Sequence, residues 1–356
     1  MFLSYDLTGT ILFTILYGLA ALSTRSNLLS ILLLGRIAGG VGTSLLFSAP
    51  EAWLVAEHQE KGFDGKWLGQ TFGWAYAGDA LVAIAAGQLS SIMATKQGPT
   101  GPFTLSLGFL IGGALLALIK WKENTAPKDS AGSGDDLTIR DGIAKVLEDR
   151  RILFVGAVQA LFEGAMYIFV LQWPPAIRAA VVSRFNEAVN VPYGKIFSCF
   201  MASCLLGTTA FGSLQKKGIQ TETTSFGMLT VATVAMGVAT ATVSGSNMGG
   251  LTAALLAFEV CVGMYFPLIG TLRSKYIPDS HRSVIMNLFG IPLNLIVVSV
   301  FLSIKKLGVK GALACSTASL SVAALCMNSL RLWKPYMGRF GSDRRYVGDE
   351  LKPLGV

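Results

Sequence analysis

Residues 34–43 read LGRIAGGVGT, inside an apolar stretch that extends over residues 29–55. Gly35 and Gly39 are one helical turn apart, and this small-xxx-small spacing lets a neighbouring helix approach closely in a membrane. Arg36 places a charge within the apolar stretch, where a cation is costly and normally faces the interior of a bundle. The pattern therefore predicts a membrane-spanning helix inside a bundle. We expect four glycines to form its packing motif, namely Gly35, Gly39, Gly40 and Gly42.

The composition of the whole chain agrees with this local pattern. Of 356 residues, 52% are hydrophobic and 14% are charged, and the mean hydropathy is +0.56. A soluble domain carries about 25% charged residues. The apolar runs are about 20 residues long, which is the length that a helix needs to cross a bilayer. We therefore expect an all-α, polytopic membrane protein that has the lipid bilayer as its solvent.

Ten apolar segments are predicted to span the membrane. They cover residues 7–23, 29–55, 71–94, 101–121, 152–173, 193–214, 224–243, 248–272, 282–304 and 308–333. The longest loop separates four of these segments from the other six. Many secondary transporters are built from two helical repeats, so this division predicts two bundles.

We expect the chain to divide into a four-helix bundle at 1–121, a linker loop at 122–151, a six-helix bundle at 152–333 and a tail at 334–356. Part of the linker, Leu137–Leu147, has helical apolar spacing and is expected on the membrane surface. Loops on the linker side hold 20 Lys and Arg residues, and loops on the opposite side hold 8. Because cytoplasmic loops are enriched in basic residues, both termini and the linker are predicted to be cytoplasmic.

Several other classes of protein are excluded by the chemistry of the side chains. The five cysteines show no CxxC spacing, and His58 and His281 lie far apart, so we expect no metal site. No nucleophile–base arrangement suggests an enzyme, no GxxxxGK[ST] motif suggests ATP, and no cofactor is expected. The net charge of +8 resides mainly in loops, so membrane topology explains it better than nucleic-acid binding does.

Arg36 and the glycines that follow it resemble the RxxxG motif on the fourth helix of the major facilitator superfamily. Within that superfamily the chain resembles the molybdate-anion transporter family, in family order from about residue 30 to 300. The matching stretches are Leu45–Ser48, Glu51–Trp53, Gln159–Glu163, Phe169–Val170, Trp173, Ile196–Ser198, Phe200–Ala202, Leu205–Gly207, Gly263–Pro267 and Asn287–Pro292.

The chain also departs from the family pattern. The Asp- and Gly-rich signature between helices two and three is absent, and Gln172 and Pro174 interrupt a stretch where FLWTP-like residues are expected. Asp79 lies where the family can carry Asn. If segment 29–55 is the fourth helix, the first two helices of the fold are lacking, which also explains the count of four plus six. We therefore expect a truncated first bundle.

The resemblance implies a secondary transporter in the plasma membrane that imports molybdate, or a similar oxyanion, by alternating access. Coupling to protons or to the membrane potential is expected. Two alternatives stay open: a major-facilitator carrier of another small solute, such as a sugar or an organic anion, and a non-transporting membrane scaffold that uses the same fold.

A tetrahedral dianion requires charge-assisted donors in a site that is shielded from lipid. Arg36 is the best-placed cation, and it either contacts the substrate or anchors helices. Gln159, Glu163 and Tyr167 are four residues apart, so they share one helix face. Glu163 is interpreted as a proton-coupling group, as the partner of Arg36 or as a hydrogen-bonded packing residue.

Five further polar residues complete the candidate set. Glu259 lies deep in its segment and has the same possible roles as Glu163. Tyr265, Asn287 and Asn294 are candidate donors to oxyanion oxygens, with interhelical hydrogen bonding as the alternative. Glu51 and Asp79 are candidate gating residues, and Glu51 is alternatively a helix cap.

Overall fold

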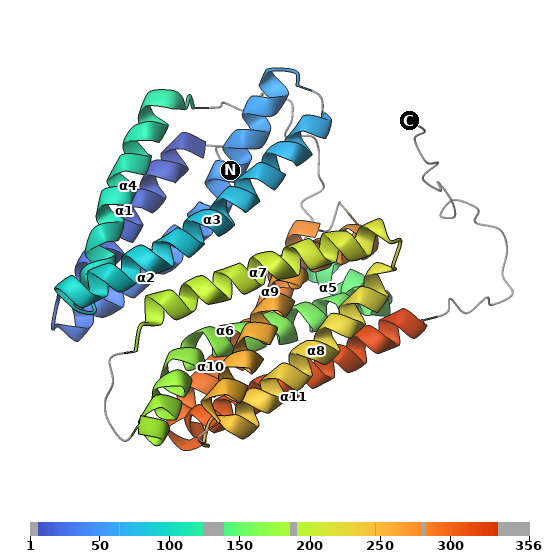
Figure 1. The fold of residues 1–356 in the computed structure, drawn as a ribbon. Coiled ribbons are helices and arrows are strands. Elements are labelled where there is room, and N and C mark those ends of the chain that lie inside the picture. The colour runs from blue at the N-terminus through green and yellow to red at the C-terminus, as the bar shows by residue number, and fades with distance from the viewer. Residues whose placement is uncertain are drawn as a thin grey trace, which may run out of the picture.

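The computed structural model describes residues 6–63, 65–123, 139–185, 191–245, 247–278 and 282–333. This part of the chain contains helices and no strand (Figure 1). The helices are α1 (Asp6–Ser23), α2 (Leu29–Glu60), α3 (Gly65–Gln97), α4 (Gly101–Lys120), α5 (Ile139–Glu148), α6 (Arg150–Phe185), α7 (Tyr193–Lys216), α8 (Thr221–Thr242), α9 (Met248–Tyr276), α10 (Arg282–Leu302) and α11 (Ile304–Leu332).

All ten predicted segments are helices, so the all-α membrane fold is confirmed. Nine of the described helices are long and apolar enough to cross a membrane, and α1 contributes a shorter apolar stretch, Leu7–Ser23. Several helices extend beyond the predicted segments. The largest extension is in α6, which continues past Pro174 and Pro175 to Phe185. Backbone hydrogen bonding is satisfied within a helix on either side of the lipid boundary, so the end of an apolar run need not end the helix.

Helices α1 to α4 form a front group in which small residues bring α1 and α2 together. A methyl group added at Gly35 would collide with Ser23, and one added at Gly42 would lie 2.8 Å from the ring of Tyr17. Gly39 lies against Ala20, 3.5 Å from where its Cβ would be. Gly40 has open space around it, because it projects from a different side of the helix.

The back group consists of α6 to α11, with α5 against its edge. Its core contains a row of aromatic rings along α6, in which each ring lies 4.1–6.0 Å from the next, centroid to centroid. In order, the members of this aromatic row are Tyr265, Phe162, Phe258, Phe169, Phe200, Trp173 and Tyr193. The rings come from α6, α7 and α9, so the row holds three helices together.

Helix α5 is the amphipathic helix expected within the linker. Its residue Val146 packs against a cluster formed by Ile152, Ile277, Ile285 and Phe289. The helix therefore docks on α6 and α10 of the back group. Asp149 then begins α6 as a cap, since its Oδ1 accepts from the backbone N–H of Arg151 at 2.9 Å.

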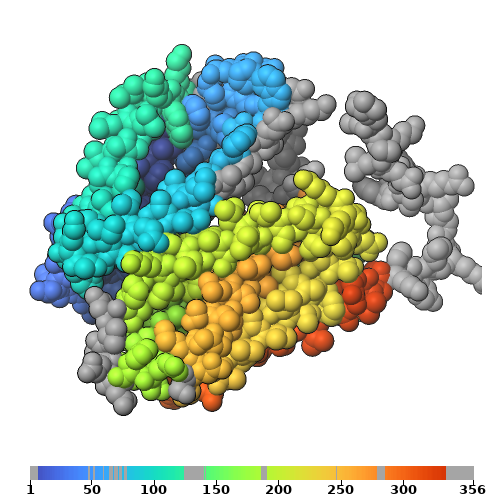
Figure 2. All heavy atoms as spheres, viewed as in Figure 1, coloured from blue at the N-terminus to red at the C-terminus, as the bar shows by residue number. Residues whose placement is uncertain are grey.

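The front and back groups meet where α3 lies beside α7 (Figures 1 and 2). Gly87 of α3 and Gly194 of α7 touch so closely that a Cβ on Gly87 would lie 2.6 Å from the carbonyl oxygen of Gly194. One turn further, the hydroxyl of Ser198 donates to the carbonyl of Ile84 at 2.8 Å. We call this contact of Ile84, Gly87, Gly194 and Ser198 the seam.

Helices α7 and α9 pack backbone to backbone through Gly207 and Gly263. A Cβ on Gly263 would collide with the carbonyl of Cys204, and one on Gly207 would collide with the carbonyl of Val260. The hydroxyl of Thr208 donates to the carbonyl of Gly263 at 3.0 Å.

Replacing Gly263 by Ala is expected to lower the melting temperature of the purified protein by several degrees, because overpacking costs about 1–3 kcal/mol. The same is expected of Gly207→Ala. Gly212→Ala on α7 and Gly270→Ala on α9 are matched controls, since a Cβ at either position meets nothing within 4 Å. Thermal unfolding in detergent measures the difference. Equal melting temperatures for all four variants would contradict this packing.

Candidate functional site

Four polar side chains meet between α6 and α9. The guanidinium of Arg273 donates through Nε to Oε1 of Gln159 at 3.0 Å and through Nη2 to Oε1 of Glu163 at 3.2 Å. The hydroxyl of Tyr265 donates to the same Glu163 oxygen at 2.8 Å. Three of the four residues, Gln159, Glu163 and Tyr265, were predicted from the sequence as candidates. We call these four side chains the polar cluster.

The polar cluster is rigid on one side and open on the other. Tyr265 is fully buried, and its ring stacks on Phe162 with centroids 4.1 Å apart. The side chains of Glu163 and Arg273 keep 17% and 22% of their exposure. The two observed bonds use two of the five N–H donors of the guanidinium. The cluster therefore combines a neutralised ion pair with donors that have spare capacity for an anion.

Arg273 was missed in the sequence because it lies near the end of its predicted segment, among other basic residues. Helix α9 continues to Tyr276, which keeps Arg273 within the helix. Its spacing from Tyr265 is eight residues, the same spacing that joins Gln159 to Tyr167. This spacing is the signal that places both α9 residues on one face.

Arg36 is not the partner of Glu163, which is paired with Arg273. Arg36 is exposed on α2, beside the glycine face that receives α1. Among the residues that the structure describes, no hydrogen bond or ion pair reaches its guanidinium. Within the described residues the guanidinium of Arg36 therefore joins no two helices.

Glu259 differs from Glu163 in having no described partner. It is 5% exposed, and no hydrogen bond or ion pair to its carboxyl group occurs within the described ranges. It lies one turn before Gly263, on the side of α9 that packs against α7. Glu259 is therefore an ionisable group buried in a membrane-spanning helix, and groups of this kind are costly and usually functional.

The other predicted site residues do not join the polar cluster. Tyr167 is 48% exposed, and Asn287 and Asp79 are also exposed. The amide of Asn294 donates to the carbonyl of Gly290, one turn earlier on α10, at 2.8 Å. The side chain of Glu51 lies outside the described residues.

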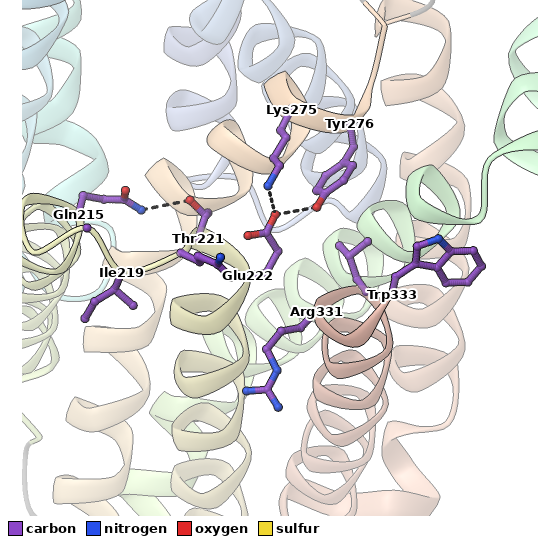
Figure 3. A pocket seen from close by; sticks show the side chains of 11 residues that line it. Gln215, Ile219, Thr221, Glu222, Lys275, Tyr276, Arg331 and Trp333 are labelled. Atoms are coloured by element: carbon purple, nitrogen blue, oxygen red, sulfur yellow. Dashed lines mark hydrogen bonds and ion pairs between the residues drawn. The ribbon is translucent and has the colours of Figure 1, made fainter. Parts of the chain in front are cut away.

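A second ionic group was not predicted and lies where α7, α8, α9 and α11 end or begin (Figure 3). Oε1 of Glu222 accepts from Nζ of Lys275 and from the hydroxyl of Tyr276, both at 2.6 Å. These side chains line a pocket of about 400 Å³ together with Arg331 and Trp333. Lys275 already neutralises Glu222, so this group ties α8 to α9.

The turn beside this pocket ends α7 with a glycine in a left-handed conformation. Gly218 has φ +70°, and the N–H of Ile219 donates to the carbonyl of Leu214 at 3.3 Å. This is the hydrogen-bond pattern of a glycine C-cap, and it sets the direction in which the chain enters α8.

Comparison with known proteins extends over nearly the whole chain. A sequence model of a family described as sugar transporters with twelve transmembrane segments matches residues 7–265. The molybdate-anion transporter of Xenopus tropicalis is 32% identical over 357 aligned positions, covering 97% of this chain and 75% of the relative. The molybdate-anion transporter of Danio rerio is 29% identical, covering 80% of this chain and 63% of the relative.

Solved transporter structures share the fold. A bacterial homologue of the iron transporter ferroportin, in an inward-facing state, superposes with a TM-score of 0.63 and 15% identity, covering 92% of this chain and 83% of that one. The fucose:proton symporter of E. coli gives a TM-score of 0.56 and 16% identity, with 92% and 84% covered. These relatives are transporters and not enzymes. The chain is thus a multi-pass membrane transporter, and it belongs to the molybdate-anion transporter family of the major facilitator superfamily.

Proposed function

We propose that this protein imports molybdate, or a similar tetrahedral oxyanion, as a secondary transporter that works by alternating access. The observation that carries the proposal is the similarity to molybdate-anion transporters over 97% of the chain. Two arginines on different helix groups, Arg36 and Arg273, support it by offering planar donors that suit oxyanion oxygens.

Alternating access requires the two helix groups to touch on one side of the substrate and to separate on the other. The seam supports this motion, because Gly87 and Gly194 allow a close contact that involves little side-chain surface. A bacterial homologue of ferroportin has been solved in inward-facing and outward-facing states, which is the same kind of motion in a protein of this fold. We propose that the seam opens when the carrier turns outward.

The orientation and the division of the chain form part of the proposal. The excess of Lys and Arg on one side favours a cytoplasmic location for both termini and for the linker at 122–151. The bundles at 1–121 and 152–333 would then be the two moving units, with the tail at 334–356 in the cytoplasm. The plasma membrane is the proposed location, since a carrier there supplies the cell with external oxyanion.

The charge of molybdate determines what coupling is useful. The electrical work is about 2.3 kcal/mol per charge per 100 mV, so a dianion enters an inside-negative compartment against about 4.6 kcal/mol. The membrane potential by itself therefore opposes import, and cotransported protons remove the opposition. Glu259 is the proposed proton carrier because it is buried without a described ionic partner, whereas Glu163 is already paired.

The second candidate function is sugar transport, favoured by the description of the matching family as sugar transporters. Uptake competition distinguishes the two. In cells that express the protein, we expect uptake of radioactive molybdate to be reduced by excess tungstate, which has the same shape and charge. An equal concentration of fucose should have no effect. Competition by fucose together with insensitivity to tungstate would establish the second candidate instead.

The two arginines should respond differently to replacement by lysine, which keeps the charge and loses the planar fork. Arg36→Lys should raise the KM for molybdate several-fold at normal folded yield, because no described residue depends on its guanidinium. Arg273→Lys should lower the folded yield, because an ammonium cannot reproduce both bonds to Gln159 and Glu163. Uptake kinetics and size-exclusion chromatography measure these effects. A loss of yield with unchanged KM in Arg36→Lys would make Arg36 a structural anchor.

The proposed coupling predicts a dependence on pH. Uptake by the parent protein should rise as the external pH falls, because protons are cosubstrates. Glu259→Gln keeps the size of the side chain, removes the proton site and should flatten this dependence. Glu163→Gln is the comparison variant, and it should retain the pH dependence at reduced stability, since it leaves Arg273 without its counter-charge. A pH profile unchanged by Glu259→Gln would remove Glu259 from the coupling.

A further inference from the structure

A cleft of about 900 Å³ opens where α3 ends, α4 begins and α7 begins. Its described lining comes from the end of α3 and the following turn, from Pro102 at the start of α4, and from residues 191–195 at the start of α7. We call it the outer cleft, because the proposed orientation places it outside the cell. Its lining residues with polar side chains are Ser90, Ser91, Thr95, Lys96, Tyr193 and Lys195.

The outer cleft has the chemistry of an anion site. Lys96 and Lys195 contribute two exposed ammonium groups, and Ser90, Ser91 and Tyr193 contribute hydroxyl groups. The hydroxyl of Thr95 also lines the cleft, but it already donates to the carbonyl of Ser91 at 3.0 Å. None of the described residues that line it is acidic. A third cation lies close by, since Nη2 of Arg25 donates to the hydroxyl of Thr104, two residues after Pro102 of the lining.

The distribution of charge over the whole chain points the same way. The proposed outer side carries eight basic residues and one acidic residue, Glu187, a formal charge of +7. The proposed inner side carries 20 basic and 17 acidic residues, a formal charge of only +3. The outer basic residues are Arg25, Lys96, Arg178, Arg184, Lys195, Lys305, Lys306 and Lys310. A surface of one sign raises the local concentration of ions of the other sign.

The inner end of the outer cleft is closed by the seam. Gly194 lines the cleft and also contacts Gly87, and the bond from Ser198 to Ile84 lies just beyond. An anion that enters the cleft therefore stops directly in front of the contact that must open. Ammonium and hydroxyl groups line this position, and both lysine side chains are exposed there.

We propose that the outer cleft is a collecting site for small oxyanions, in which Lys96 and Lys195 concentrate hydrated dianions before the seam opens. The inference rests on the proposed function for its substrate and its orientation. The site increases the rate at which the carrier binds its oxyanion, so it lowers KM. The maximal rate is determined by the later conformational steps and is unchanged. Its contribution should weaken as salt increases, because exposed charges are screened within about 8 Å at physiological ionic strength.

The first test measures molybdate uptake by the double variant Lys96→Gln, Lys195→Gln. At low ionic strength its KM should rise at least threefold, with the maximal rate within twofold of the parent, and the difference should shrink in high salt. The matched control is Lys305→Gln, Lys310→Gln, which removes the same charge from the same side away from the cleft. Equal KM values for the two double variants would overturn the proposal.

The second test does not depend on transport. Thr95→Cys, in a background with the four cysteines that are not buried (Cys199, Cys204, Cys315 and Cys326) replaced by Ser, places one accessible thiol beside Lys96. Intact cells are treated with an anionic or a cationic methanethiosulfonate reagent of similar size. The ratio of the two reaction rates should favour the anionic reagent, and removing both lysines should lower this ratio about tenfold.

The two tests separate the possible failures. A charge-dependent ratio without any molybdate uptake would leave the anion site standing and overturn the proposed substrate. Molybdate uptake with a ratio that ignores both lysines would overturn the anion site alone. Labelling of Thr95→Cys only after the cells are opened would place the cleft inside the cell and overturn the proposal through its orientation.

Discussion

Close contact between helix backbones is the constraint on which this structure depends. In lipid there is no hydrophobic force that drives one apolar helix against another, so packing at small residues has to hold the helices together. Helix α7 shows this most clearly, because it makes close backbone contacts at glycines on two sides. Gly207 and Gly263 join it to α9 within the back group, and Gly194 joins it to Gly87 of α3 at the seam. One contact is internal and the other joins two groups, so only the second can separate without unfolding a bundle.

The lipid solvent also constrains how charged side chains inside the bundles are paired. Arg273 and Glu163 neutralise each other and are held in place by Gln159 and Tyr265. Glu259 and Arg36 have no such described partner. Buried or intramembrane ionisable groups are costly and usually functional. On the proposed function, the paired residues would hold a fixed geometry in which Arg273 keeps spare donors for an oxyanion, and Glu259 and Arg36 would be free to exchange a proton and to contact substrate.

The sequence was sufficient for the order and type of the helices, because most apolar runs are about 20 residues long and carry few charges. It was insufficient for the helix ends, as α6 shows: Pro174 and Pro175 lie inside a helix that continues to Phe185. Gln159, Glu163 and Tyr265 were found from their depth and spacing. Arg273 was not found, because an arginine near a helix end is ordinarily an interfacial residue. Only its contact with Gln159 and Glu163 of α6 shows that it is part of the site. The ion pair of Glu222 and Lys275 joins two helices far apart in sequence and has no local signal.

The aromatic row has a mechanical consequence. Its rings extend along α6 from Tyr265, which bonds to Glu163, to Tyr193, which lines the outer cleft. Closely packed rings have few alternative rotamers and resist compression, so the aromatic row forms a rigid contact between α6, α7 and α9. We therefore expect a displacement at the polar cluster to move α6, α7 and α9 together, because the rings that join these helices leave little room for local repacking.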